Sequence, residues 1–300
     1  MESIVDIANL TRRYRRVAAL DDVSLHIRQG GVVGLVGENG AGKTTLIKHI
    51  LGLLRAQKGS VQVFGMNPCK HPQEVLSRIG YLSEHRDLPG WMRIDELMRY
   101  TRALYPKWDP EYARNLIRVF ELDPTAKIRT LSMGQTAKAG LVTALAHRPE
   151  FLVLDEPSSG LDPIVRRDIL GAVFREVASE GRTVLFSSHL LHEVETVSDR
   201  VIMISAGKVI LDSPLKDVMR SHQRLVVDSS NGQAPKLALP GQLSCEAHHG
   251  RWHIVCQGDL EPLRAEAARQ GVALIEAGPA TLDDIFVARA GRRISETVEE

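Results

Sequence analysis

The chain has 300 residues, 43% of them hydrophobic and 25% charged, which is enough length for a sizeable core and the composition of an ordinary globular protein. Its formal net charge of +1 provides no overall field for nucleic acid or an anionic membrane. Three cysteines, Cys69, Cys245 and Cys256, are too few and too scattered for a disulfide framework or a zinc cluster.

The N-terminal residues show neither the basic start nor the long apolar run of a secretory signal. The longest apolar stretches, such as 151–154 and 184–186, have the length of strands rather than of membrane spans. We therefore expect a cytoplasmic protein, with another chain crossing any membrane that is involved.

Short β-branched and apolar runs recur along the first part of the chain. They lie at 23–27, 32–36, 61–64, 151–154, 183–187 and 201–204. Helix-like stretches separate several of these runs, and this alternation predicts an α/β core. Between Ile94 and Phe120 apolar residues recur at helical spacing, and Pro106 and Pro110 mark a break, so a helical insert is predicted there.

Beyond Pro214 the sequence changes character, with Gly, Pro, Ser and Gln accumulating between residues 229 and 242. The elements expected in this part are a strand at 253–256, a helix at 260–270 and a strand at 272–275. We therefore divide the chain into a main domain at 1–220 and a small α+β extension at 221–300. The charged tail from Arg292 onward is expected to be frayed.

A segment that follows the strand at 32–36 fits the phosphate-loop pattern G-x-x-x-x-G-K-[ST]. Glycines let the backbone turn its amides toward phosphate oxygens, and the helix that follows offers its positive N-terminus. Lys43 would neutralise phosphate charge, and the Thr44 hydroxyl would bind Mg²⁺. A coincidental Gly-rich turn is the alternative. The predicted nucleotide-binding residues of this segment are Gly37, Glu38, Asn39, Gly40, Ala41, Gly42, Lys43, Thr44 and Thr45.

Two acidic residues, Asp155 and Glu156, directly follow the apolar run at 151–154. Carboxylates at the C-terminal edge of a buried strand meet the phosphate site of such a fold. Asp155 would hold Mg²⁺ directly or through water, and Glu156 would orient and polarise the attacking water. A strand capped by solvated acids is the alternative. Together with the phosphate loop, however, the pair predicts nucleotide hydrolysis.

The segment Leu131-Ser132-Met133-Gly134-Gln135 resembles the L-S-G-G-Q signature of ABC ATPases, with Met133 in place of the first glycine. Over residues 1–215 the motifs follow the order of that family. They are Tyr14, the phosphate loop, Glu84, the signature, Asp155-Glu156, Ser159-Gly160-Leu161-Asp162 and His189. The resemblance implies an α/β P-loop NTPase core of the ABC ATPase type. That core carries an antiparallel β subdomain, a helical signature subdomain at about 85–145 and the small C-terminal α+β extension.

The resemblance implies that Tyr14 stacks on adenine, a contact for which a flat aromatic ring is suited. An ordinary tyrosine in an arginine-rich segment is the alternative. We expect the arginines to form a solvated face, with phosphate steering or binding of anionic lipid as alternatives. They are Arg12, Arg13, Arg15 and Arg16.

In this family the signature faces the ATP that is bound by a partner subunit. The resemblance therefore implies that Ser132, Gly134 and Gln135 act on the opposite nucleotide, so that two chains close head-to-tail around two ATP molecules. The partner would be a second copy or a homologous ATPase subunit. Met133 leaves Ser132 and Gly134 in place, and its side chain would narrow or reposition this contact.

Three further residues take roles that the resemblance implies. Glu84 stands where the family usually has glutamine; it can accept from a metal-bound water but lacks the amide donor. Similar substitutions occur in the export-type branch with ABC-2-like membrane partners. His189 matches the switch histidine that hydrogen-bonds the γ-phosphate, and Asp162 matches the loop by which one nucleotide site senses the other.

The resemblance also implies polytopic membrane permeases as partners, docked on the helical insert. Leu88, Trp91 and Met92 are the candidates for an exposed contact there. The segment 281–286 resembles a C-terminal helix of exporter ATPases that packs on the main domain. We therefore expect an ATPase subunit that uses ATP and Mg²⁺ to energise export through separate membrane-spanning subunits, peripheral on the inner face of the cell membrane.

Two other functions stay open at this point. One is a soluble ABC ATPase that acts on nucleic acid, ribosomes or cofactor assembly, and the other is a nucleotide-binding regulator that hydrolyses little. The single motif set and the lack of a strongly basic signal argue against the first, and no nucleic acid is expected as a partner. Glu156 and His189 argue against the second.

Overall fold

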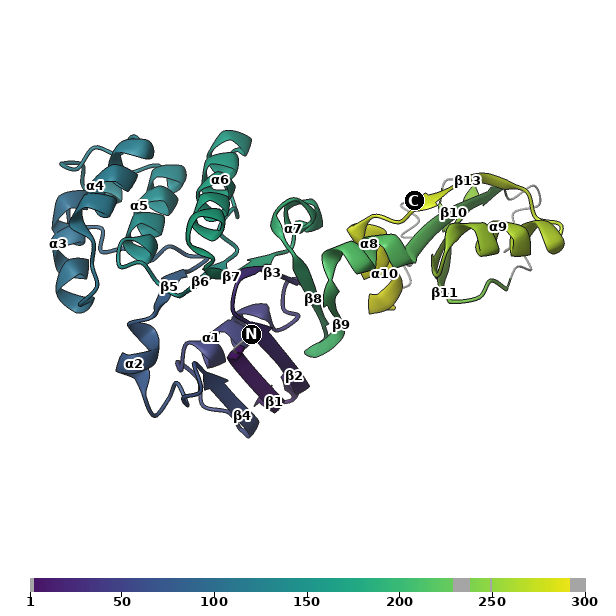
Figure 1. The fold of residues 1–300 in the computed structure, drawn as a ribbon, viewed down its shortest axis with the longest axis horizontal. Coiled ribbons are helices and arrows are strands. Elements are labelled where there is room, and N and C mark those ends of the chain that lie inside the picture. The colour runs from purple at the N-terminus through teal and green to yellow at the C-terminus, as the bar shows by residue number, and fades with distance from the viewer. Residues whose placement is uncertain (1–2, 229–237, 249, 292–300) are drawn as a thin grey trace. The chain divides into compact units, whose positions relative to one another are not determined.

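The computed structural model describes residues 3–228, 238–248 and 250–291. The chain forms two compact units, Met1–Asp212 and Ser213–Glu300 (Figure 1). We expected the second part to begin at residue 221. Helix α8 (Leu215–Ser221) instead belongs to the second unit, because it packs against the strand that follows it, β10 (His222–Asp228). No helix in the described part of the chain is long and apolar enough to span a bilayer.

A six-stranded sheet with the order β5-β6-β7-β3-β8-β9 forms the centre of the first unit. The strands are β3 (Gly31–Val36), β5 (Ile79–Leu82), β6 (Phe151–Asp155), β7 (Thr183–Ser188), β8 (Arg200–Ser205) and β9 (Lys208–Pro214). Every pairing from β5 through β8 is parallel. Strands β6 and β7 are buried along their whole length, which explains why they read as continuous apolar runs.

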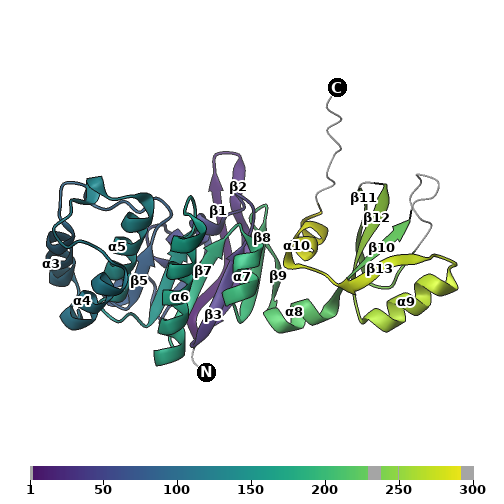
Figure 2. The same cartoon turned by 90° about the horizontal axis from the view of Figure 1, so that it is seen from above.

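Helices cover both faces of this sheet (Figure 1). Helix α1 (Lys43–Ile50) lies on one face, and α6 (Pro163–Glu180) and α7 (Leu191–Val197) lie on the other. Figure 2 shows α6 and α7 side by side over β7 and β3. The connections β3-α1, β6-α6 and β7-α7 all leave the carboxyl edge of the sheet, so the residues at these three junctions meet there.

An antiparallel sheet with the order β2-β1-β4 accompanies the central sheet, as the resemblance implied. Its strands are β1 (Ser3–Tyr14), β2 (Val17–Arg28) and β4 (Lys58–Val63). Buried and exposed residues alternate along the second half of β2, the pattern of a strand with one solvated face. One apolar core joins the buried side chains of this sheet to α1 and to the central strands. Its members include Leu10, Leu20, Ile27, Leu46, Ile47 and Phe151.

The helical insert contains α3 (Ile94–Leu104), α4 (Pro110–Val119), a 3₁₀ turn (Ile128–Thr130) and α5 (Met133–Leu145), and a short helix, α2 (Pro72–Leu76), precedes β5. The predicted helices and the break between them are confirmed. Pro110 occupies the first turn of α4, and the carboxylate of Asp109 accepts hydrogen bonds from the backbone N–H groups of Glu111 and Tyr112. Proline at this position and an aspartate cap both favour a helix start.

In its described residues, the second unit consists of a four-stranded antiparallel sheet with the order β11-β12-β10-β13 and the helices α8, α9 and α10. The elements not yet placed are β11 (Gln242–His248), β12 (Arg251–Gln257), α9 (Leu260–Arg269), β13 (Leu274–Pro279) and α10 (Leu282–Ala290). The strand predicted at 272–275 begins only at Leu274, because the N–H of Val272 donates to the Ala267 carbonyl and still closes α9. Helix α10 packs on β11 and β12. The predicted frayed tail lies outside the described residues.

Candidate functional site

The phosphate-loop segment connects β3 to α1, which begins at Lys43. Gly42 has φ +115°, and a Cβ there would lie 2.4 Å from the Ala19 carbonyl oxygen. A Cβ at Gly37 would lie 2.4 Å from the carbonyl oxygen of Ile204. Glycine is therefore required at both positions, by close backbone approach and at Gly42 also by conformation. This geometry leaves the turn tight in front of the helix N-terminus, where an anion is favoured.

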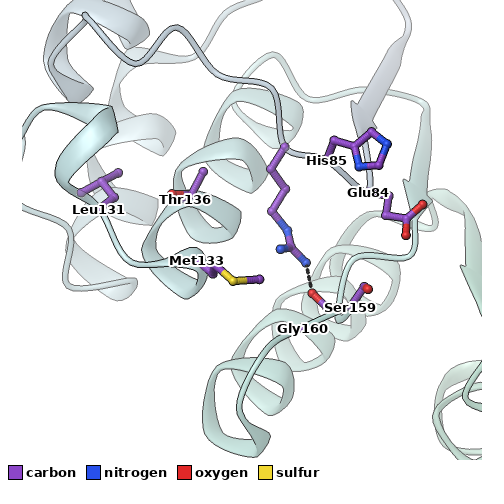
Figure 3. Close-up of a pocket in the computed structure, with 8 residues that line it drawn as sticks. Glu84, His85, Leu131, Met133, Thr136, Ser159 and Gly160 are labelled. Carbon is purple, nitrogen blue, oxygen red and sulfur yellow. Dashed lines mark hydrogen bonds between the residues drawn. The ribbon is translucent and has the colours of Figure 1, made fainter.

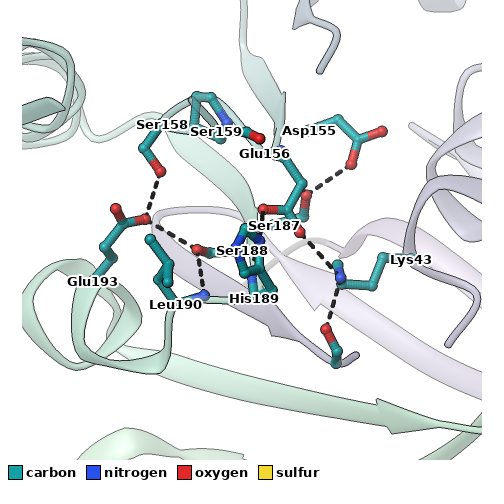
Figure 4. Close-up of polar contacts among 12 residues, drawn as sticks. Lys43, Asp155, Glu156, Ser158, Ser159, Ser187, Ser188, His189, Leu190 and Glu193 are labelled. Atoms are coloured by element: carbon teal, nitrogen blue, oxygen red, sulfur yellow. Dashed lines mark hydrogen bonds and ion pairs between the residues drawn. The ribbon is translucent and has the colours of Figure 1, made fainter. Parts of the chain in front are cut away.

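Lys43 and Glu156 form a buried ion pair in front of this loop. The Lys43 Nζ lies 3.0 Å from Glu156 Oε1, and each side chain is only 6% exposed. The same Nζ donates to the Gly37 carbonyl oxygen at 2.7 Å and approaches that of Glu38 at 3.3 Å (Figure 4). A buried ammonium and a buried carboxylate are thus placed together at the turn that a phosphate would enter.

Asp155, the last residue of β6, is fixed by a neighbouring strand. The Ser187 hydroxyl of β7 donates to Asp155 Oδ1 at 2.8 Å and accepts from the backbone N–H of Glu156 at 2.9 Å. Burial raises the pKa of Asp155, opposed by hydrogen bonds from Ser187 and Thr44, while the charges of Glu156 and Glu84 add to the rise. Of the predicted residues, Thr44 and Glu84 therefore both lie close enough to Asp155 to act on its carboxylate.

His189 completes the cluster from the end of β7. Its Nδ1 lies 2.7 Å from Glu156 Oε2, and its backbone N–H points to the same oxygen at 3.3 Å (Figure 4). The imidazole is partly exposed, whereas the carboxylate is buried. Glu156 itself has φ +48°, an uncommon conformation for a residue other than glycine, which aims its side chain between Lys43 and His189.

The oxygen donors at this edge fit a small divalent cation. The Thr44 hydroxyl hydrogen-bonds the Asp155 carboxylate. A cation would relieve the repulsion between this carboxylate and the charges of Glu156 and Glu84. Among the described residues no cluster of three or more His, Cys, Asp or Glu suited to a metal is found. In proteins Mg²⁺ is usually held by one or two carboxylates together with substrate phosphates and water, and the Asp155 carboxylate with the Thr44 hydroxyl is a donor set of that kind.

The signature residues open α5 and lie apart from this cluster. Ser132 Oγ accepts from the N–H of Gln135, and Gln135 Oε1 accepts from the N–H of Ser132, a reciprocal capping box. Gly134 is buried, and a Cβ there would lie 3.0 Å from Val165. Met133 is 58% exposed. Its methyl carbon packs over Gly160 of its own chain, since a Cβ on that glycine would lie 2.7 Å from it.

A cavity of about 360 Å³ separates the signature from Glu84 (Figure 3). It is lined by Glu84, His85, Arg86, Leu131, Met133, Thr136, Ser159 and Gly160. Arg86 is buried, and its guanidinium donates to the carbonyl oxygens of Pro157 and Ser159 at 3.0 and 2.7 Å. Burial lowers the pKa of Arg86, and the charge of Glu84 opposes the shift. Arg86 thus ties the segment after β5 to the loop that follows Glu156.

Sequence comparisons relate the chain to known proteins. The profile of the ABC transporter family matches residues 20–159. The Nod factor export ATP-binding protein I of Burkholderia orbicola is 30% identical, over 97% of this chain and 98% of its own length. The chain belongs to the family of ABC transporter ATP-binding proteins. The bacitracin transport ATP-binding protein BcrA of Bacillus licheniformis is 29% identical, over 97% of this chain and 98% of its own.

The expected fold class is confirmed by solved structures. An ATP-binding subunit of an ABC transporter superposes with a TM-score of 0.66 at 28% identity, covering 72% of this chain and 92% of that one. A dimeric ATP-binding cassette bound to ADP and Pi superposes with a TM-score of 0.64, covering 70% of this chain and 98% of that one, at 23% identity. The latter likeness concerns the fold alone.

Two further residues, Tyr14 and Asp162, were predicted by resemblance to ABC ATPases. Tyr14 ends β1 and is 44% exposed, and the guanidinium carbon of Arg12 lies 4.8 Å from the centre of its ring. Asp162 precedes α6, and its Oδ1 accepts from the N–H groups of Ile164 and Val165, so it also caps that helix.

The residues expected to dock a membrane partner differ in exposure. Trp91 is 72% exposed, Leu88 is half-buried and Met92 is buried. Of these three residues of the ABC ATP-binding chain, Trp91 therefore exposes the most apolar surface. Met92 belongs to the core of the helical insert.

Three polar residues that support the segments of this site were not predicted from the sequence: Ser187, Arg86 and Glu193. Ser187 lies in a buried strand next to the residues that end it, and that position was the available signal. Arg86 and Glu193 contact the loop after Glu156 from distant segments. Nothing in their local sequence indicates those partners.

Proposed function

We propose that this chain binds ATP with Mg²⁺ and hydrolyses it, and that hydrolysis drives export through separate membrane-spanning subunits. The observation that carries the proposal is the junction of Lys43, Asp155, Glu156 and His189 at one edge of the sheet, beside the phosphate loop. These groups supply a cation, an oxygen ligand, a base and a hydrogen-bonding imidazole, which together meet the demands of a γ-phosphate.

In the proposed reaction, the backbone of residues 37–42 and Lys43 hold the phosphate chain. Thr44 and Asp155 would hold Mg²⁺, which when bound neutralises charge on the β- and γ-phosphates. Glu156 accepts a proton from a water that attacks the γ-phosphorus, while the bond from that phosphorus to the bridging oxygen breaks and ADP leaves with the electron pair. His189, fixed beside Glu156, hydrogen-bonds the transferred group.

The signature supports a dimer in this proposal. Ser132 and the N-terminus of α5 do not join the cluster around Glu156, and they are available for the γ-phosphate held by a second subunit. The chain would therefore close head-to-tail with another copy or with a homologous ATPase subunit, with one ATP at each of two composite sites. Tyr14 would stack on adenine at its own site.

Transport is supported by two relatives whose names state a function, and the export direction by one of them. One is a bacitracin transport protein and the other a Nod factor export protein, and each aligns over 97% of this chain. We propose polytopic permeases as partners, docked near Trp91, which would place the chain peripherally on the inner face of the cell membrane. The transported molecule would contact the permeases.

The test is purification of the tagged full-length chain from native membranes in mild detergent, with mass spectrometry of the recovered proteins. The proposal predicts a polytopic membrane protein whose presence stimulates ATP hydrolysis. Recovery of only ribosomal, nucleic-acid or assembly proteins, with hydrolysis unchanged, would favour a soluble ABC ATPase instead. The variant Trp91→Ala should no longer co-purify with the membrane protein, but it should keep basal hydrolysis.

A further inference from the structure

A buried carboxylate lies behind the catalytic cluster and is not part of it. Glu193, on α7, is 2% exposed. Figure 4 shows its side chain directed at two serines, Ser158 and Ser188, which come from different segments of the chain. Burial of an ionised carboxylate is costly unless charged or hydrogen-bonding partners compensate, so these contacts need an explanation.

Both serines donate to one oxygen of this carboxylate. The hydroxyl of Ser158 lies 2.7 Å from Glu193 Oε2, and that of Ser188 lies 3.0 Å from it. Ser188 Oγ also accepts from the N–H of Leu190 at 3.0 Å. The Ser188 hydroxyl is therefore held at both its donor and its acceptor side, and its rotation is fixed.

The second oxygen has a cationic neighbour. Arg166, on α6, places its Nε 3.1 Å from Glu193 Oε1, and its side chain is 27% exposed. The Arg166 guanidinium therefore supplies a countercharge to this buried carboxylate. A charged acceptor makes stronger hydrogen bonds to the serines than a neutral one would.

The two serines adjoin the two residues that meet at the reaction site. Ser158 lies two residues after Glu156, and Ser188 lies directly before His189. We propose that Glu193 is a positioning residue for ATP hydrolysis, which fixes the segments of Glu156 and His189 relative to one another. Its own contacts are with Ser158, Ser188 and Arg166, none of which belongs to the phosphate loop. The inference rests on the proposed hydrolysis.

The test compares Glu193→Gln with Ser158→Ala and Ser188→Ala in the full-length chain. Glu193→Gln keeps the side-chain shape but loses the charge, so both serine contacts weaken together. Misplacement of reacting groups by about 1 Å can slow a reaction up to ~100-fold, so we expect kcat to fall by about 10- to 100-fold. The KM and the Kd for ATP should stay within about twofold, because the phosphate loop is untouched.

A double-mutant cycle and a control make the effect specific. Once Glu193 is Gln, adding Ser188→Ala should change kcat by less than it does in the wild type, since the two residues act as a unit. Thr196→Ala, on the exposed side of the same helix, should keep the wild-type kcat. Amide hydrogen exchange should rise jointly in 157–162 and 188–190 in Glu193→Gln.

The outcomes separate this inference from the proposed function. A wild-type chain that hydrolyses no ATP contradicts the proposed function, and the exchange data then decide alone whether Glu193 holds the two segments. Wild-type hydrolysis together with an unchanged kcat in Glu193→Gln, or in both serine variants if that protein does not fold, overturns the inference. If kcat falls and the Kd for ATP rises by the same factor, the inference is also overturned, because a residue that only positions Glu156 and His189 should change turnover and leave ATP binding unchanged.

Discussion

Glu156 Oε2 and His189 Nδ1 lie 2.7 Å apart and join the residues that follow two neighbouring parallel strands, β6 and β7. The contact forms because parallel strands end at the same edge of a sheet, which brings side chains more than thirty residues apart in sequence to one point. Lys43 contacts the other carboxylate oxygen of Glu156 and so connects the phosphate loop to the same place. The catalytic proposal depends on this junction of three segments.

Lys43→Ala should weaken nucleotide binding strongly. A charge-assisted hydrogen bond contributes about 1.5–3 kcal/mol, so we expect the Kd for ATP to rise by about 10- to 100-fold. The change also leaves Glu156 buried without its cationic partner, which should lower the melting temperature. Isothermal titration measures the first effect and thermal denaturation the second. Unchanged ATP affinity would refute the phosphate-loop assignment.

Gly42→Ala and Gly40→Ala form a matched pair that tests the shape of the phosphate loop. Both glycines have positive φ, but a Cβ at Gly42 would lie 2.4 Å from a backbone oxygen, whereas at Gly40 nothing lies within 4 Å. Gly40→Ala should therefore destabilise the fold by the backbone strain alone, about 1–3 kcal/mol. Gly42→Ala should destabilise the fold by more than this and should also impair ATP binding. Equal urea midpoints for the two variants would contradict this geometry.

Stability should fall in mild acid, in part because of His147. Its ring is buried and stacks on Tyr105, and burial lowers its pKa from the value of 6.5. With a lower pKa in the folded state, the unfolded chain binds the proton first. The contribution of neutral His147 to the free energy of unfolding is therefore fully present above pH 6.5, and it is lost as the pH falls through the folded-state pKa.

His147→Gln should consequently reduce the loss of stability between about pH 8 and about pH 5, the range in which histidine titrates. The variant loses the contact with the Ile79 carbonyl at every pH, so it should be less stable at the upper value. Urea unfolding at both values measures the difference. A loss on acidification as large as in the wild type would show that His147 does not contribute.

The sequence predicted the parallel core strands and the residues at their ends because each depends on a local pattern. The apolar run before Asp155, the glycines before Lys43 and the helical spacing after Ile94 are readable without tertiary contacts. Strand β1 was not predicted, since polar residues such as Asn9 interrupt it and its pairing with β2 shifts register several times. Such a strand is stabilised by its neighbours rather than by its own pattern.

The supporting side chains could not be predicted for a related reason. Arg86 bonds to carbonyl oxygens of Pro157 and Ser159, and Glu193 bonds to Ser158, so their partners are defined only once the sheet has formed. Likewise, the sequence showed that Met133 departs from the family pattern. Only the structure placed its methyl group over Gly160 of the same chain.

Single-turnover ATP hydrolysis by wild type and Glu156→Gln, with gel filtration of both in ATP and Mg²⁺, tests the central proposal most directly. The loss of the carboxylate base should slow hydrolysis by about 100-fold or more while ATP still binds, so the variant should accumulate as a dimer that the wild type forms only transiently. Wild-type hydrolysis by Glu156→Gln, with a monomer in ATP, would contradict both the role of Glu156 and the ATP-dependent dimer.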